Sequence, residues 1–152
     1  APRKLQVDDL LVVEGHADRM QIGRCARVTS NAEGMTFQNH LFRLRSRGRV
    51  DPYFGCLWLN SQYAQRYWNA RCATSSGLNT INQRTLRRMA MPIPPRPEQE
   101  KIVALVQAQR CQLECLISKR LALAALQRAL AQDLLAGRVR ISAAPLDLVG
   151  VP

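Results

Sequence analysis

Arginine dominates the residues of this chain that could bind a ligand. The formal net charge is +11, and 19 of the 22 basic residues are arginine. Residues 1–96 hold 15 of the basic residues against six acidic ones, so most of the excess positive charge lies there. A guanidinium can pair bidentately with phosphate oxygens or with the O6 and N7 atoms of guanine. The composition predicts a polyanionic partner, with double-stranded DNA as the natural candidate, although a GC-rich genome also raises the arginine share.

One segment, residues 39–49, alternates between basic and apolar residues. On a strand this pattern places arginines on one face and turns Phe42 and Leu44 toward the core. For Arg47 and Arg49, in a predicted turn, a solvated outer face is an equally good interpretation. His40 could also be an ordinary core or surface histidine. The candidates for DNA contact in this segment are Asn39, His40, Arg43 and Arg45.

Residues 73–82 are small and polar, which predicts a loop facing DNA. Their hydroxyl and amide groups can bond to phosphates or base edges. The candidates here are Ser75, Ser76 and Asn79. An ordinary loop leading to a capped helix or a strand is the alternative.

Residues 53–68 have apolar side chains three and four apart, which predicts a short helix behind the turn at Pro52. We expect its aromatic side chains to lie in the core. Stacking of Tyr63 or Trp68 on a base is the alternative, because nucleic-acid binders use aromatic rings in that way.

No catalytic site, metal site or cofactor is expected. The five cysteines form no C-x-x-C pair and are odd in number, which indicates reduced thiols. Cys111 and Cys115, one helical turn apart, are expected to be buried small apolar residues. His16 and His40 suggest no catalytic dyad, there is no glycine-rich cofactor loop, and residues 51–54 only superficially resemble a DNA-methyltransferase tetrad.

A proline-rich spacer, residues 92–97, precedes a segment that predicts one long helix, residues 98–136. Proline at the first helical position, acidic residues in the first turn and Gly137 after the last favour these ends. The helix would span about 40 residues and roughly 60 Å. A helix of this length needs a partner, because a small domain cannot bury it.

The long helix carries a mostly apolar seam at alternating spacings of four and three, which is typical of coiled coils. Leu105, Ile117, Leu121 and Leu126 widen it, so pairing with a second helix is favoured over packing on its own domain. The predicted interface residues are Ile102, Val106, Gln109, Leu113, Leu116, Leu123, Leu130 and Leu134, with Arg120 and Gln127 as polar interruptions.

The fold class predicted from these patterns is α+β: a small sheet-containing globule, residues 1–91, followed by the spacer, the coiled-coil-forming helix and a loose tail, residues 137–152. No run approaches the roughly 18 apolar residues of a membrane span, and no signal-peptide pattern is present. A cytoplasmic protein with no membrane contact is therefore expected.

Two motifs resemble the specificity subunit of type I restriction-modification enzymes. Residues 93–103, Ile-Pro-Pro-Arg-Pro-Glu-Gln-Glu-Lys-Ile-Val, are similar to the family's P-L-P-P-x-x-E-Q-x-x-I-V start of a conserved spacer helix. Residues 133–141 are similar to the L-L-T-G-R-V-R-V segment that closes that helix, with Ala136 in place of the usual threonine. Residues 8–15, 22–24 and 75–79 resemble weaker signatures of the target-recognition domain.

The resemblance implies a noncatalytic subunit that reads one half of a split DNA site. It adds Arg24 to the candidates for DNA contact. It also implies that modification subunits, which transfer methyl groups from S-adenosylmethionine, and restriction subunits pack against the chain. Only about 90 residues precede the spacer, so we expect a partial recognition domain and a homodimer through the helix.

Two other classes of function remain. An enzyme is disfavoured because its motifs are missing. A noncatalytic coiled-coil assembly adaptor, whose basic region binds RNA or an acidic protein, would suit the long helix equally well. Binding to duplex DNA that weakens steeply with added salt would separate the recognition subunit from the adaptor.

Overall fold

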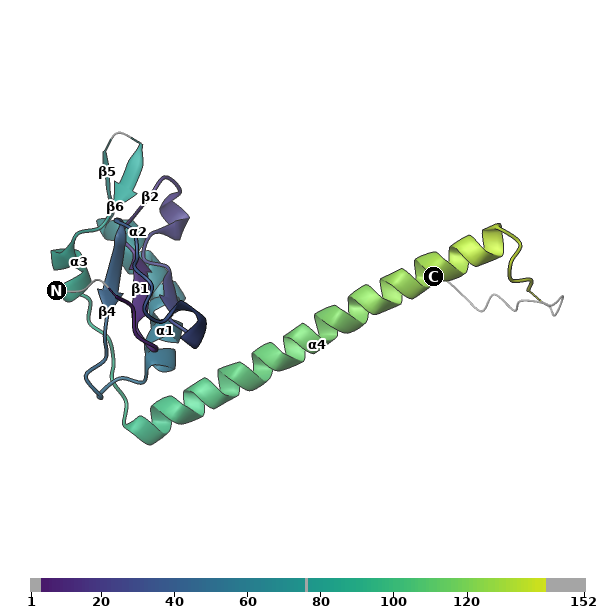
Figure 1. Ribbon diagram of the computed structural model, residues 1–152. Helices are drawn as coiled ribbons and strands as arrows, with labels where there is room; N and C mark the ends of the chain where they lie inside the picture. Colours follow the sequence, from purple (N-terminus) through teal and green to yellow (C-terminus); the bar gives the residue numbers. More distant parts are fainter. Residues whose placement is uncertain (1–3, 76, 142–152) are drawn as a thin grey trace. The chain divides into compact units, whose positions relative to one another are not determined.

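The computed structural model describes residues 4–75 and 77–141, and it divides into two units, residues 1–106 and 107–152. The described part contains two small antiparallel sheets, several short helices and one long helix, α4 (Arg96–Leu135) (Figure 1). The predicted α+β class is confirmed.

The first sheet has the strand order β3-β1-β4 and forms one wall of the core. Its strands are β1 (Leu10–Val13), β3 (Cys25–Arg27) and β4 (Leu41–Leu44). Val12 is fully buried and lies opposite Phe42, while Leu10 lies opposite Leu44, so the prediction that Phe42 and Leu44 face the core is confirmed.

The strand β4 is shorter than the alternating segment that predicted it. His40, before the strand, has a φ of 70°, outside the β region. After the strand, Gly48 has a φ of 92° and the Ser46 hydroxyl donates a 2.6 Å hydrogen bond to the carbonyl oxygen of Val50. These local contacts fold residues 46–50 into a turn, so Arg47 and Arg49 leave the strand.

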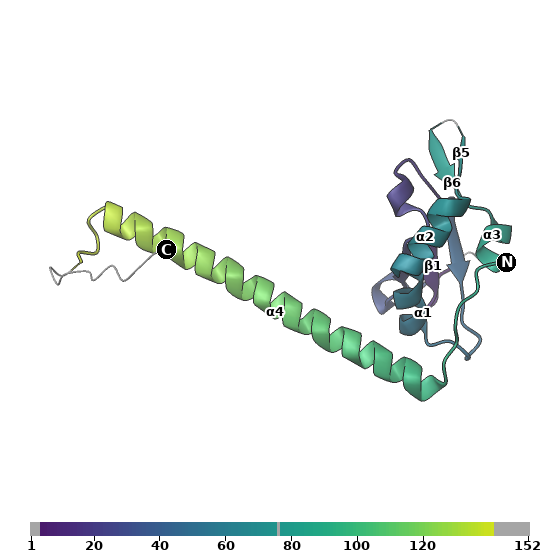
Figure 2. The same ribbon diagram turned by 180° about the vertical axis from the view of Figure 1, so that it is seen from behind.

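Two helices cover one face of this sheet (Figures 1 and 2). They are α1 (Pro52–Leu59) and α2 (Gln62–Arg71), where the sequence predicted a single helix over 53–68. The break has a physical cause: the Asn60 side chain donates to the carbonyl oxygens of Cys25 and Cys56, and the Ser61 hydroxyl caps α2.

The aromatic residues of α1 and α2 have different environments. Trp68 is fully buried and packs in the core cluster, as predicted. Tyr63 is 61% exposed, so the expectation of burial is wrong for that ring.

The second sheet has the order β2-β6-β5, with β2 (Gly15–His16), β5 (Ala73–Ser75) and β6 (Leu78–Thr80). Most of the polar segment 73–82, predicted as a loop, is thus a hairpin. Asn79 explains the difference, because its side-chain amide donates to the carbonyl oxygens of His16 and Ala17 and its oxygen accepts a 2.8 Å bond from Thr74. Two short 3-10 turns, Arg19–Gln21 and Ser30–Ala32, and the helix α3 (Gln83–Arg87) complete the elements before α4.

The long helix α4 (Arg96–Leu135) matches the predicted span within two residues at each end. Gly137 has a φ of 69°, its amide donates to Leu134, and the amide of Arg138 donates to Asp133. These bonds form a Schellman motif, so the glycine cap predicted at Gly137 is confirmed. Cys111 and Cys115 are exposed in this chain, so their predicted burial is wrong.

Candidate nucleic-acid interface

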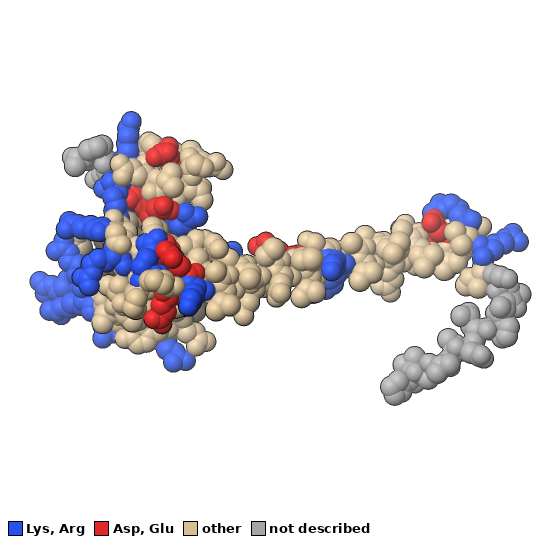
Figure 3. Space-filling view, turned by 90° about the horizontal axis from the view of Figure 1, so that it is seen from below, with Lys and Arg blue, Asp and Glu red and all other residues tan. Residues whose placement is uncertain are grey.

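Basic side chains gather over one side of the globular unit, whereas uncharged atoms make up most of the surface of α4 (Figure 3). In the globular unit, few of the arginines are neutralised: the ion pairs of the described residues up to position 100 use Arg27, Arg45 and Arg96. The remaining arginines leave a net positive surface for an anionic partner.

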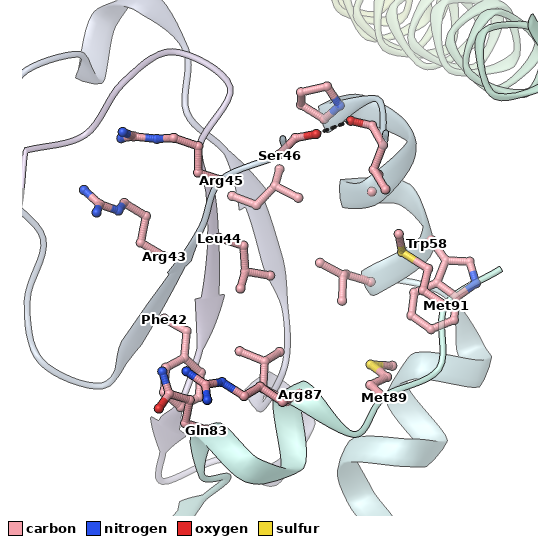
Figure 4. Close-up of a pocket in the computed structure, with 16 residues that line it drawn as sticks. Phe42, Arg43, Leu44, Arg45, Ser46, Trp58, Gln83, Arg87, Met89 and Met91 are labelled. Atoms are coloured by element: carbon pink, nitrogen blue, oxygen red, sulfur yellow. Dashed lines mark hydrogen bonds between the residues drawn. The ribbon is translucent and has the colours of Figure 1, made fainter. Parts of the chain in front are cut away.

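Arg43 lies on β4 and remains available for contact. Its guanidinium and that of Arg45 lie on the opposite side of the strand from Leu44 (Figure 4). Arg43 donates a 2.9 Å hydrogen bond to the carbonyl oxygen of Lys4, and its Cζ lies 5.9 Å from the ring centroid of Phe37. These contacts use one donor of five and hold the guanidinium plane, so further donors remain for phosphate oxygens.

Arg45 has a structural partner. Its Nε and Nη2 donate bonds of 2.6 and 2.8 Å to the two carboxylate oxygens of Asp9, which is fully buried. Asp9 also accepts a bond from the amide of Gln6, and the hydrogen bonds from Arg45 hold the pKa of the Asp9 carboxyl below its usual range. Arg45 therefore compensates the buried charge of Asp9.

Asn39 and His40 lie side by side at a small pocket of about 360 Å³, which Glu14, Phe37, Gln38 and Leu41 also line. The carbonyl oxygen of His40 accepts a 2.8 Å bond from the amide of Glu14, and a Cβ placed on Gly15 would lie 2.9 Å from the His40 Nδ1. This close approach fixes the loop. Both side chains are exposed, so their polar groups can reach a ligand.

The candidates in the hairpin differ from one another. Ser75 is exposed at the end of β5. Asn79 is 8% exposed and its side-chain amide is occupied by the bonds that join the hairpin to β2, which indicates a supporting role for it. Ser76 lies outside the described residues.

Arg24 is exposed just before β3. Its Nη1 donates a 2.7 Å bond to the side-chain oxygen of Gln21, which in turn donates to Asp18. The structure therefore brings Asn39 and His40 together and holds Arg43 beside Arg45, while Arg24 and the hairpin candidates belong to other segments. DNA contact by any of them stays a prediction.

An apolar groove of about 470 Å³ lies between β4, α1 and the segment after α3 (Figure 4). Phe42, Leu44, Trp58, Met89 and Met91 are among the residues that line it. No pattern in the sequence predicts this groove, because its walls come from three segments far apart along the chain.

Neither a metal-binding cluster nor an activated Cys25 thiol is found among the described residues. Within the part of the chain that it describes, no three His, Cys, Asp or Glu side chains are grouped so that they could hold a metal ion. A hydrogen bond with the Cys56 thiol, together with burial, raises the pKa of the Cys25 thiol. A raised pKa keeps that thiol protonated, and the nucleophilic form is the thiolate. Among residues 4–75 and 77–141, no helix has both the length and the apolar character needed to span a membrane.

Comparison with known proteins bears on the resemblance seen in the motifs. No family model matches the chain. Over 104 residues, 68% of its length, the chain is 31% identical to the type I restriction enzyme StySPI specificity subunit of Salmonella potsdam. The chain is a relative of type I specificity subunits. The matched region spans 22% of the length of the Salmonella protein, so the resemblance is confirmed for a part of such a subunit.

Gln99, the glutamine of the E-Q pair in the specificity-subunit motif, has a structural role at the start of α4. Gln99 is fully buried, accepts a 2.7 Å bond from the amide of Asp51 and donates to the carbonyl oxygens of Arg49 and Pro94. The motif is recognisable in the sequence, but this role is not, because it depends on contacts 48 and 50 positions apart.

The predicted interface residues of α4 fall into two groups in this specificity-subunit relative. Ile102, Val106 and Leu134 are half-buried. The others are exposed, with 57% exposure for Leu113, 62% for Leu116, 66% for Leu123 and 51% for Leu130, and Gln109 is exposed as well. The middle of the seam, from Leu113 to Leu130, is thus a mostly apolar surface that the described chain leaves exposed.

Proposed function

We propose that the chain is a DNA-recognition region of a type I specificity subunit, which binds one half of a split target and docks modification subunits through α4. It carries out no chemistry itself. The observation that carries the proposal is the similarity to the StySPI specificity subunit, found in a chain that also has a basic globular unit and a long helix.

Arg43 supports DNA binding by this chain. Its guanidinium is oriented by Lys4 and Phe37 on the outer face of β4, and no carboxylate among the described residues pairs with it. Nearby, Asn39 and His40 offer side chains that can donate to bases or phosphates. Arg43 would position the domain on the DNA backbone. The side-chain amide of Asn39 and the imidazole of His40 would contribute to the recognition of bases.

The exposed seam of α4 supports a helical partner. Its leucines at coiled-coil spacing are half or more exposed. When a second helix packs on them, the buried apolar area stabilises the pair by about 25 cal/mol per Å². The partner helix would belong to a second copy of the chain or to another part of a full specificity subunit. Modification and restriction subunits would bind the resulting assembly, in the cytoplasm.

The alternative is the noncatalytic coiled-coil adaptor. The same exposed seam favours it, because the seam specifies a helical partner without specifying DNA. In that case the basic unit would bind RNA or an acidic protein with no preference for duplex DNA.

Anisotropy of a labelled duplex, measured from 50 to 300 mM salt, tests the proposal. We expect affinity to fall steeply with salt, because phosphate contacts release counterions. The salt slope is the slope of the logarithm of the affinity against the logarithm of the salt concentration. Arg43→Gln should weaken binding to every duplex and reduce the magnitude of this salt slope by about one, while Arg43→Lys should keep most of it. Equal affinity for duplex, single-stranded RNA and an acidic peptide would favour the adaptor.

A further inference from the structure

A second basic pocket, of about 560 Å³, lies between α2 and the end of α3. Its lining residues are Tyr63, Arg66, Tyr67, Arg71, Arg88 and Ala90. Of these residues, the sequence suggested a nucleic-acid role only for Tyr63, as a ring that could stack on a base; the arginines of the pocket were not among the candidates. The pocket combines three guanidinium groups and two phenol rings, and no acidic residue of the described chain lines it.

The spacing along α2 explains how the pocket forms. Arg66 and Tyr67 lie three and four positions after Tyr63, and Arg71 lies four positions after Tyr67, so the four side chains share a helix face. Ala64 and Trp68, on the other face, are fully buried in the core. The core contacts of α2 thereby fix which residues point to solvent.

Tyr67 joins the two walls of the pocket. Its hydroxyl donates a 2.9 Å hydrogen bond to the carbonyl oxygen of Thr85 in α3, and its ring lies 4.0 Å from the Cζ of Arg71. Stacking on the ring restrains the guanidinium plane and leaves its N–H groups free at the edge. Arg71 is therefore partly preorganised for a planar or tetrahedral oxyanion.

The positive charge in the pocket is not balanced within the described chain. Arg66, Arg71 and Arg88 form no ion pair there, in contrast to Arg27, Arg45 and Arg96. Like charges that converge on one pocket repel each other, and a bound anion relieves that repulsion.

We infer that this pocket binds a phosphodiester of DNA, with Arg66, Arg71 and Arg88 as ligands of the phosphate oxygens and Tyr63 packed on the adjoining sugar or base. This inference rests on the proposed function, because it assigns a second contact to the same partner. Nucleic acid is favoured over an acidic protein because Tyr63, 61% exposed, presents an aromatic face beside the arginines, as in proteins that bind bases by stacking.

The test is a double variant, Arg66→Gln with Arg88→Gln, compared with Arg110→Gln with Arg128→Gln on α4. Both variants lose two positive charges, so the comparison separates the pocket from net charge. We expect the pocket variant to bind duplex DNA about 10-fold or more weakly and to lower the salt slope by about two. The α4 variant should stay within about threefold of the unmodified protein. A single variant, Tyr63→Ala, should weaken binding with no change in slope.

Each result has a distinct meaning. If the unmodified chain binds DNA and the pocket variant keeps its affinity and slope, the pocket assignment is overturned while the proposed function survives. Loss of modification-subunit binding with unchanged DNA binding would assign the pocket to an acidic protein partner instead. Displacement of the duplex by inorganic phosphate, beyond the effect of equal ionic strength, would assign it to a small anion. If the unmodified chain binds no duplex, both proposals fail together.

Discussion

The side-chain oxygen of Gln99, in the first turns of α4, accepts a 2.7 Å hydrogen bond from the backbone amide of Asp51, the residue that caps α1. The carboxylate of Asp51 accepts bonds from the amides of Tyr53 and Phe54 and pairs with Arg96 at 2.9 Å. The start of the long helix and the start of α1 therefore share one network of hydrogen bonds.

Replacing Gln99 should destabilise the globular unit. Gln99→Ala leaves the Asp51 amide and the carbonyl oxygens of Arg49 and Pro94 without partners, so we expect the free energy of unfolding to fall by about 1–3 kcal/mol. Glu100→Gln is the control, because it removes only an exposed pair with Arg96. Urea unfolding measures both variants, and equal effects would show that the network contributes nothing.

The ion pair of Asp9 and Arg45 predicts a dependence of stability on pH. A carboxyl whose pKa is lowered by folding stabilises the native state above its unfolded pKa of about 3.9, and this stabilisation is lost as the pH falls through the folded pKa. Between pH 5 and pH 2.5 the unmodified protein should therefore lose more stability than Asp9→Asn.

Asp18, whose pKa is also lowered, chiefly by its bond from the Met20 amide, is present in both proteins. The difference between the two stability curves therefore isolates Asp9. Parallel curves from urea titrations across this pH range would mean that the pair with Arg45 does not stabilise the fold.

Gly23 occupies a position where a side chain has no room. Its φ is 76°, and a Cβ there would lie 2.0 Å from the Cδ1 of Trp68. Gly23→Ala should lower the free energy of unfolding by about 2–4 kcal/mol, through backbone strain and overpacking. Gly34 has the same φ, and no atom lies within 4 Å of a Cβ placed there. Gly34→Ala should therefore lower the free energy of unfolding through backbone strain alone, by about 1 kcal/mol. Equal losses in thermal unfolding would contradict the packing around Trp68.

The seam of α4 predicts a change of oligomeric state. Leu113→Glu combined with Leu130→Glu places two charges in the apolar seam and should reduce the mass in solution to that of the monomer. Gln107→Glu combined with Gln132→Glu, off the seam, should leave the mass unchanged. An unaltered mass for the leucine variant in sedimentation equilibrium would contradict the assignment of the seam as the dimer interface.

Local patterns in the sequence predicted the features that depend on near neighbours. The span of α4 follows from helix formers between prolines and Gly137, and the inward side of β4 follows from alternation. Other features depend on distant contacts. Asn60 ends α1 through the Cys25 carbonyl 35 positions away, and Asn79 turns a polar segment into a hairpin through contacts 62 and 63 positions away.

The candidate site shows the same division. Residue type identified Arg43 and Arg45 as one pair, but their different roles depend on Asp9, 36 positions from Arg45, and on Lys4, 39 positions from Arg43. The pocket at Tyr63 and Arg88 is lined by residues from α2 and from the end of α3, so no local pattern in the sequence predicts it.

Light scattering after size exclusion tests the central claim most directly, with the chain run alone, with a purified cognate type I modification subunit, and with both the subunit and duplex DNA. The account predicts a dimer that takes up the modification subunit and then DNA in stoichiometric amounts. A monomer that elutes apart from both partners would contradict it.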